Sequence, residues 1–178
     1  VQQPTTTRAT EPIAPAITVQ IRDKSGKDVA QAGLAVTLTL SSGTGTLSGT
    51  TTRSTNASGR ATFDDISLNL IGSKQLRAAA SGLTSTTSSS FTITLGPAVQ
   101  LRITTEPSSS ATAGVAFATQ PVLNVVDAGG NRVTTDNSTV VTAARLAGSG
   151  TLQGVLTATA SSGTVRFSSL SHNVADTI

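Results

Sequence analysis

The sequence predicts an all-β fold, and three features of its composition point to it. Ser and Thr together make up about 31% of the 178 residues, and the branched Cβ of Thr packs well on a pleated, half-exposed sheet surface. Residues that favour helices are scarce, with two Glu, three Lys and no Met. Aromatic residues are limited to four Phe, so the core is expected to be aliphatic with a few rings: Phe63, Phe91, Phe117 and Phe167.

A sequence repeat with a period of about 104 residues predicts two domains. Residues 23–29 match residues 127–133, and residues 58–63 match residues 162–167. Shorter matches follow in the same order: 46–49 with 151–154, 66–68 with 170–172, and 3–6 with 106–109, the last one residue out of step. Gly96-Pro97 is a breaker pair between the repeats. We expect domains at residues 1–95 and 98–178, with residues 96–97 as the junction.

Alternating apolar and polar residues predict the strands of the first repeat in order. Residues 17–22 form a half-buried strand, and residues 23–27 form a turn in which Gly26 adopts a positive φ. Residues 34–40 place Leu34, Val36, Leu38 and Leu40 on one face, and residues 41–45 form a flexible loop. Further strands are expected at residues 61–63, 76–80 and 91–95. About seven strands in roughly 95 residues is the number typical of an immunoglobulin-type sandwich, and no segment has the period of a helix.

The ordered motifs resemble the bacterial immunoglobulin-like repeats of invasin- and intimin-type surface proteins. The elements that carry the resemblance are the Asp-x-x-Gly turns at Asp23 and Asp127 and the Gly-Thr-Leu-x-Gly segments at Gly45 and Gly150. The Gly-x-Ala/Val-x-Phe strands at Gly59 and Gly163, Gln3-Pro4 and the closing residues 91–94 complete it. The resemblance covers nearly all of the chain. It implies two tandem immunoglobulin-like β-sandwiches of a secreted protein, used as a stalk or spacer, with no catalytic residues.

The second repeat is expected to lack its last strands. Ile178 corresponds to Lys74, so nothing in the sequence corresponds to residues 75–95. Without those strands we expect an open groove lined by Leu123, Val125, Val141 and Phe167. Two explanations stay open: the sequence is a piece of a longer array, or a neighbouring subunit donates the missing strands, as in a polymerising fibre.

Composition excludes several classes of function. There is no cysteine, so disulfides, thiolate catalysis and Cys-type zinc sites are excluded. The net charge of +3 comes from scattered Arg rather than a basic run, and stacking aromatics are missing, so nucleic-acid binding is not expected. No signal peptide, membrane-spanning run or sorting motif is visible in the sequence.

Polar clusters are expected to be structural, so we predict no catalytic, cofactor-binding or metal-ligating residue and no cofactor. His172 is the only histidine and aligns with Leu68, which suggests an edge or surface position. Calcium prefers six to eight oxygen ligands, more than the acidic turns offer. Asp64 and Asp65 are adjacent, so on a strand they point to opposite faces and make a poor acid–base pair. The acidic turns contain Asp23, Ser25 and Asp28 in the first repeat and Asp127, Asn131 and Asp136 in the second.

Three further motifs are also expected to be structural. An isopeptide bond from Lys24, Lys27 or Lys74 is not expected as a general feature, because the second repeat has no Lys. Residues 56–58 and 137–139 match the N-glycosylation pattern but also suit turns. Residues 42–45 are rich in Gly but lack the helix and Lys of a phosphate loop.

The sequence therefore favours a non-catalytic structural repeat of an extracellular or bacterial cell-surface protein, acting as stalk, spacer or fibre. An adhesive module that recognises a host receptor or glycan is one alternative, and an accessory region of a secreted enzyme is another. The expected partners are neighbouring repeats in the same chain, and identical subunits if strands are donated. A glycan ligand would normally meet exposed aromatics, and the four Phe are expected in cores or at edges.

Overall fold

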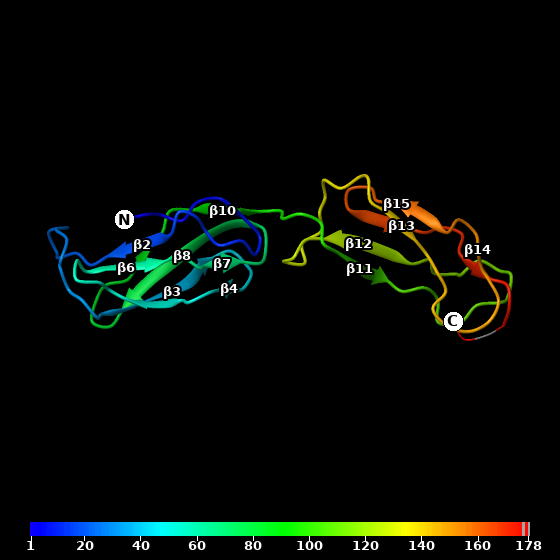
Figure 1. The fold of residues 1–178 in the computed structure, drawn as a ribbon, viewed down its shortest axis with the longest axis horizontal. Coiled ribbons are helices and arrows are strands. Elements are labelled where there is room, and N and C mark those ends of the chain that lie inside the picture. The colour runs from blue at the N-terminus through cyan, green and yellow to red at the C-terminus, as the bar shows by residue number, and fades with distance from the viewer. Residues whose placement is uncertain (176, 178) are drawn as a thin grey trace. The chain divides into compact units, whose positions relative to one another are not determined.

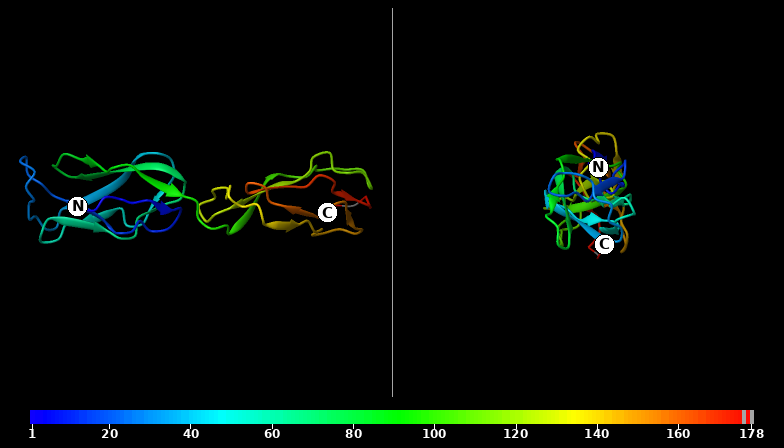
Figure 2. Two further views of the ribbon diagram at one scale, coloured as in Figure 1. Left: turned by 90° about the horizontal axis from the view of Figure 1, so that it is seen from above. Right: turned by 90° about the vertical axis from the view of Figure 1, so that its left-hand side faces the viewer.

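The computed structural model describes residues 1–175 and 177 and confirms the all-β prediction. The described residues form strands, turns and loops with no helix, as two directions of view show (Figures 1 and 2). Backbone contacts divide the chain into two compact units. Unit 1 contains Val1–Gly96 and Gly129–Asn131, and unit 2 contains Pro97–Ala128 and Arg132–Ile178.

Unit 1 is built from a large sheet and a two-stranded sheet that face each other (Figure 1). The large sheet has the order β1-β10-β8-β3-β5, with β9 paired to β8, and β1 lies parallel to β10. Its strands are β1 (Thr7–Arg8), β3 (Ala35–Ser42), β5 (Thr52–Ser54), β8 (Gly72–Ala80), β9 (Thr86–Thr87) and β10 (Phe91–Thr94). The second sheet pairs β2 (Ile17–Gln20) with β6 (Arg60–Phe63), and a separate short pair joins β4 (Leu47–Ser48) to β7 (Ser67–Leu68).

Side chains from both sheets of unit 1 meet in one core. The fully buried residues include Phe63 and Ala61 from β6 and Val36 from β3. The expected alternation in β3 is present, because Val36 and Leu38 are buried and Leu34 and Leu40 pack against the core. The strand is longer than expected: it continues to Ser42, which pairs with Gln75, so the expected loop at residues 41–45 is wrong for its first two residues.

Unit 2 contains one three-stranded sheet and two short pairs. The sheet has the order β11-β12-β16, with β11 (Gln100–Thr105), β12 (Val122–Val126) and β16 (Thr164–Arg166). The pairs join β13 (Val140–Thr142) to β15 (Thr157–Thr159), and β14 (Leu152–Gln153) to β17 (Ser171–His172). Among the described residues no strand follows β17, so β8, β9 and β10 have no counterpart there, and Ile178 lies outside the described residues.

The core of unit 2 does not open where the sequence suggested. Val125, Val141 and Phe167 are buried, with exposed fractions of 3%, 9% and 6%, and Leu123 is half-buried. The expected groove along these four residues is therefore wrong, because they pack against one another and against Ala160, Val165 and Leu170. The exposed aliphatic side chains of this sheet lie on β11 and just before it: Val99, Leu101 and Ile103.

The two units share one backbone framework at the predicted offset. In unit 1 the pair β2·β6 matches Thr18 with Thr62, and in unit 2 the pair β12·β16 matches Val122 with Arg166, each 104 positions later (18 + 104 and 62 + 104). Hydrogen bonds around these strands recur too. Ile21 N donates to Gly59 O and Val29 N to Ile21 O in unit 1, as Val125 N does to Gly163 O and Val133 N to Val125 O in unit 2.

A glycine at the start of β6 and of β16 lets two chain segments pass at short range. Gly59 has φ of 75°, and a Cβ at this position would lie 1.9 Å from Val29 O. Gly163 has φ of 72°, and a Cβ there would lie 2.4 Å from Val133 O. Both the left-handed backbone and the lack of space therefore require glycine. This explains why the Gly-x-Ala/Val-x-Phe motif occurs in both repeats.

We predict that Gly59→Ala lowers the free energy of unfolding of unit 1 by about 2–4 kcal/mol, since strain and a backbone clash add. Gly82→Ala is the matched control, because Gly82 also has φ of 75° but a Cβ there would meet nothing within 4 Å. The control should cost only about 1 kcal/mol. Urea unfolding of both variants measures this, and equal losses would show that the approach to Val29 does not matter.

Candidate functional site

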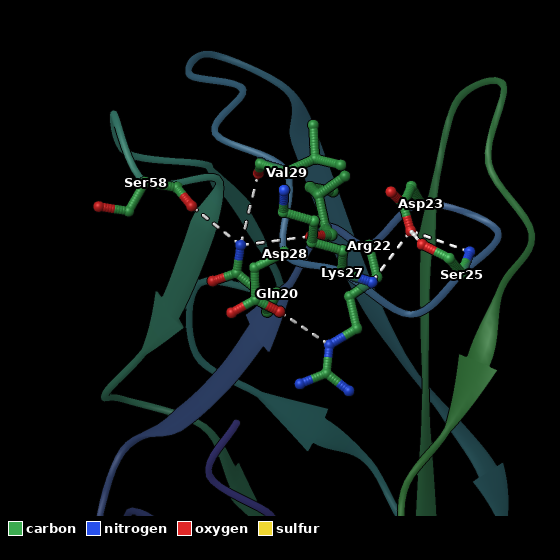
Figure 3. A network of polar contacts seen from close by, with 9 residues as sticks. Gln20, Arg22, Asp23, Ser25, Lys27, Asp28, Val29 and Ser58 are labelled. Carbon is green, nitrogen blue, oxygen red and sulfur yellow. Dashed lines mark hydrogen bonds and ion pairs between the residues drawn. The ribbon is translucent and has the colours of Figure 1, made fainter.

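The acidic turn of the first repeat uses its carboxylate to hold the backbone (Figure 3). Asp23 Oδ1 accepts hydrogen bonds from Ser25 N at 2.9 Å, Ser25 Oγ at 2.6 Å and Lys27 N at 2.9 Å. The Ser25 hydroxyl and the turn amides hold the pKa of Asp23 below its usual value. Gly26 has the expected positive φ of 82°. The predicted Asp turn is confirmed, and its carboxylate oxygen faces donors rather than a space for a cation.

Two more side chains tie this turn to the neighbouring strands (Figure 3). Arg22 Nε donates to Asp28 Oδ1 at 2.9 Å, an ion pair that is more than half exposed on both sides. Gln20 Nε2 lies 2.9 Å from Ser58 O and 3.4 Å from Val29 O, so one amide group joins β2 to both turns. Nothing in the sequence had singled out Gln20, because its partners are backbone carbonyls up to 38 residues away.

The acidic residues of the second repeat are divided between different places. Asp127 is 1% exposed, whereas Asp136 caps the next turn and accepts from Ser138 N at 2.9 Å and Thr139 N at 3.0 Å. These bonds, led by the one from the Thr139 hydroxyl, lower the pKa of Asp136 to about 2. Within the part of the chain that the structure describes, no three acidic or histidine side chains gather as metal ligands.

Asp64 and Asp65 lie differently from the expectation. They follow β6 in a bend rather than sitting on a strand, so they do not point to opposite faces. Arg53 Nη2 lies 2.7 Å from Asp64 Oδ1 and 3.2 Å from Asp65 Oδ1. The Thr50 hydroxyl, ahead of Arg53, holds the pKa of Asp65 below its usual value. The lowered pKa of Asp65 favours its ionised form, so this carboxyl is not suited to act as a general acid.

His172 is buried, and the expected edge or surface position is wrong. Its exposed fraction is 5%, because β17 turns this side chain to the side that Leu68 occupies in unit 1. Nδ1 lies 2.7 Å from Val174 O, which makes Nδ1 the protonated nitrogen. Nε2 is buried without a hydrogen-bond partner among the described residues. The hydrogen bond of the ring is to a backbone carbonyl and the side chain is buried, as expected for a residue that replaces Leu68 in the core.

Lys74 is the one lysine of the core of unit 1 among the described residues. It lies on the buried face of β8 with Leu76 and Ala78, and it is 1% exposed. Its ammonium group donates to Ile71 O at 3.1 Å. Burial lowers the pKa of Lys74. This contact is with a backbone carbonyl, whereas an isopeptide bond would need an Asp or Asn side chain.

The remaining candidates lie on the surface. Lys24 and Lys27 are exposed in the Asp23 turn. Asn56 and Asn137, the two positions of the glycosylation pattern, are exposed as well. Each uses its Oδ1 atom in a turn: Asn56 accepts from Ser58 N at 3.0 Å and Arg60 N at 3.1 Å, and Asn137 accepts from Ser162 N at 2.8 Å.

We predict that Lys74→Met raises the free energy of unfolding at pH 7 by about 1 kcal/mol, because it removes a buried charge and keeps the volume of the side chain. The folded-state pKa of Lys74 is lowered, so the cost of burying its charge is present at low and neutral pH. That cost falls as pH rises toward the unfolded value. The advantage of the variant should therefore shrink between pH 7 and about pH 10.5. Urea titrations at the two pH values measure it, and an advantage independent of pH would contradict the assignment.

Among the described residues there is no helix long and apolar enough to cross a membrane. Comparison of this chain with family models, with curated proteins and with solved structures gave no match.

Proposed function

We propose that this chain is a non-catalytic structural segment of an extracellular or cell-surface protein, in which tandem immunoglobulin-like sandwiches act as a stalk, spacer or fibre. The resemblance to bacterial surface repeats supports the proposal. So does the strand order of unit 1, in which β1-β10-β8-β3-β5 faces the pair β2-β6. The first residues of unit 1 also pass from one sheet to the other, since Gln2 O accepts from Thr18 N of β2 and β1 pairs with β10. Facing sheets joined by such a segment are a feature of these sandwiches.

The observation that carries the proposal is that the backbone framework repeats, and that a polar side chain repeated with it serves the backbone: Asn69 Oδ1 accepts from Thr46 N in unit 1 as Asn173 Oδ1 does from Thr151 N in unit 2, each at 2.7 Å. The ladder β2·β6 recurs as β12·β16 in the same register. At equivalent positions, however, Asp28 is replaced by Arg132, Asp65 by Ser169 and Leu68 by His172. A binding or catalytic site common to the repeats would need its side chains in both. What the two units share is therefore packing and the hydrogen bonds that hold the backbone, which is what a spacer requires.

The four Phe side chains argue against the glycan-binding alternative. Phe63, Phe91 and Phe167 are buried, and Phe117 is half-buried and packs against the core of unit 2. Sugar rings stack on exposed aromatic faces, and among the described residues no exposed aromatic side chain is present. A receptor-binding role would have to use the polar loops alone.

We predict that an unrelated, rigid pair of β-sandwiches of the same length can replace residues 1–178 in the native polypeptide. If the segment is a spacer, antibodies reach the flanking parts of the polypeptide as well in the replacement variant as in the native one. Deletion of the segment should reduce antibody binding to those parts. Flow cytometry of cells that carry the replacement variant or the deletion variant measures this. Saturable binding of the purified 178-residue chain to target cells, lost on replacement of its loops, would contradict the spacer role and support adhesion.

A further inference from the structure

A long apolar groove lies open within unit 1. Its volume is about 850 Å³, and it runs between β2 on one side and β8 with the segment up to Ser88 on the other. The two strands contribute Val19 and Ile21 from β2 and its extension, and Leu76, Ala78 and Ala80 from β8. Val1 and Gln2 are among the residues that line it, and the N-terminus lies beside β2 in Figure 1. We call this the β2–β8 groove.

In unit 2 a strand lies along the edge that corresponds to the free edge of β2. β11 pairs with β12, which is the counterpart of β2, and its register places Leu101 opposite Val125 and Ile103 opposite Leu123. Val125 and Leu123 correspond to Ile21 and Val19 in unit 1, 104 positions earlier (125 − 104 and 123 − 104). The repeat thus shows which kind of segment belongs along the outer edge of β2.

The first residues of unit 1 already pair with the start of β2, as the end of β11 pairs with the start of β12. Thr18 N donates to Gln2 O at 3.1 Å, which sets Gln2 opposite Thr18 as Thr105 lies opposite Val122. Antiparallel pairing carries a chain traced back from Gln2 along β2 toward Arg22. Alternate residues of a strand direct their amides to the same side. Ile21 N bonds Gly59 O on the side of β6, so the amides of Gln20 and Arg22 face the opposite side, toward the groove.

The side-chain pattern of β11 matches the groove. Val99, Leu101 and Ile103 alternate with polar residues, and in unit 2 they are 61%, 42% and 49% exposed. Unit 2 has no described counterpart of β8 to cover them. Unit 1 contains β8 itself, and Leu76 and Ala78 of this strand line the groove. A strand of this pattern in unit 1 would be paired to β2 through its backbone and covered by β8 through its side chains.

We propose that the β2–β8 groove is the seat of an extended strand of the β11 pattern, with aliphatic side chains at alternate positions, that enters directly upstream of Val1 in the same chain. The added strand makes a three-stranded sheet in the order added strand, β2, β6, which corresponds to β11-β12-β16 of unit 2. It also covers the edge of β2, which is otherwise open to pairing. The proposal rests on the tandem-repeat part of the proposed function. Its test uses only the 178-residue chain, so it can fail while the spacer role stands.

The test adds the missing strand. A copy of residues 97–103, Pro-Ala-Val-Gln-Leu-Arg-Ile, is fused ahead of Val1 of the full chain, because Gln2 takes the place of Thr105 and Val1 that of Thr104. The matched control carries Leu101→Asp and Ile103→Asp in the copied segment only, so the native β11 is unchanged. Amide hydrogen exchange of Gln20 and Arg22, followed by NMR, reports pairing along β2, and the melting temperature reports the stability of unit 1.

We expect the fused strand to slow exchange at Gln20 and Arg22 by roughly tenfold or more relative to the chain without it, and to raise the melting temperature of unit 1. The Asp-bearing control should behave like the chain without a fusion. Equal exchange in the fusion and in its control would overturn the proposal. Protection by the free peptide of residues 97–103, without protection by the fused copy, would overturn the connection in the same chain and assign the groove to a strand from another chain.

Discussion

The close approach of two turns, at Gly59 beside Val29 and at Gly163 beside Val133, is the constraint on which the rest of each unit depends. A side chain at either glycine would push the turns apart. With glycine there, Ile21 N reaches Gly59 O, and β6 enters in the one register that puts Phe63 opposite Ile17. Because a shift of one residue would turn Phe63 away from the core, this register decides what is buried in unit 1.

The same constraint explains why the two units can differ so much in their polar side chains. The backbone bonds around Ile21 and Val125 are the same, although several polar side chains near them differ between the units. Around that framework, Asp65 contacts Arg53 and Thr50 in unit 1, whereas Ser169 at the equivalent position receives a bond from Val155 N. Either side chain satisfies the same turn. A function that relies on the framework alone tolerates such exchange.

Local patterns in the sequence predicted the strands, whereas positions decided by distant contacts were missed. Alternation found β2, β3, β8 and β10, since a sheet with one buried face imposes a period of two. Repetition found the Gly59 motif. His172 was misplaced because its burial depends on the face to which β17 turns it. Asp64 and Asp65 were misplaced because β6 ends at Phe63, and their shared partner Arg53 lies eleven residues from Asp64 in the sequence.

The prediction of an open groove in unit 2 was also wrong, because burial depends on contacts between residues that are distant in the sequence. The sequence identified which strands have no counterpart, but not which side chains would be left uncovered. Val125 and Phe167 find neighbours within their own sheet and the adjoining loops. The aliphatic side chains of Leu101 and Ile103 on β11 have no such neighbours and remain exposed. Which side chains stay exposed depends on packing in three dimensions. The exposed side chains of β11 in unit 2 indicate which kind of strand fits the β2–β8 groove of unit 1.

The intact mass of the polypeptide from its native source tests the proposed spacer role, because a repeat that serves as a spacer is expected to belong to an array. We expect a mass well above 17.8 kDa, with further copies of the Gly-x-Ala/Val-x-Phe motif in the additional sequence at the same period. A native polypeptide of 17.8 kDa would contradict the array.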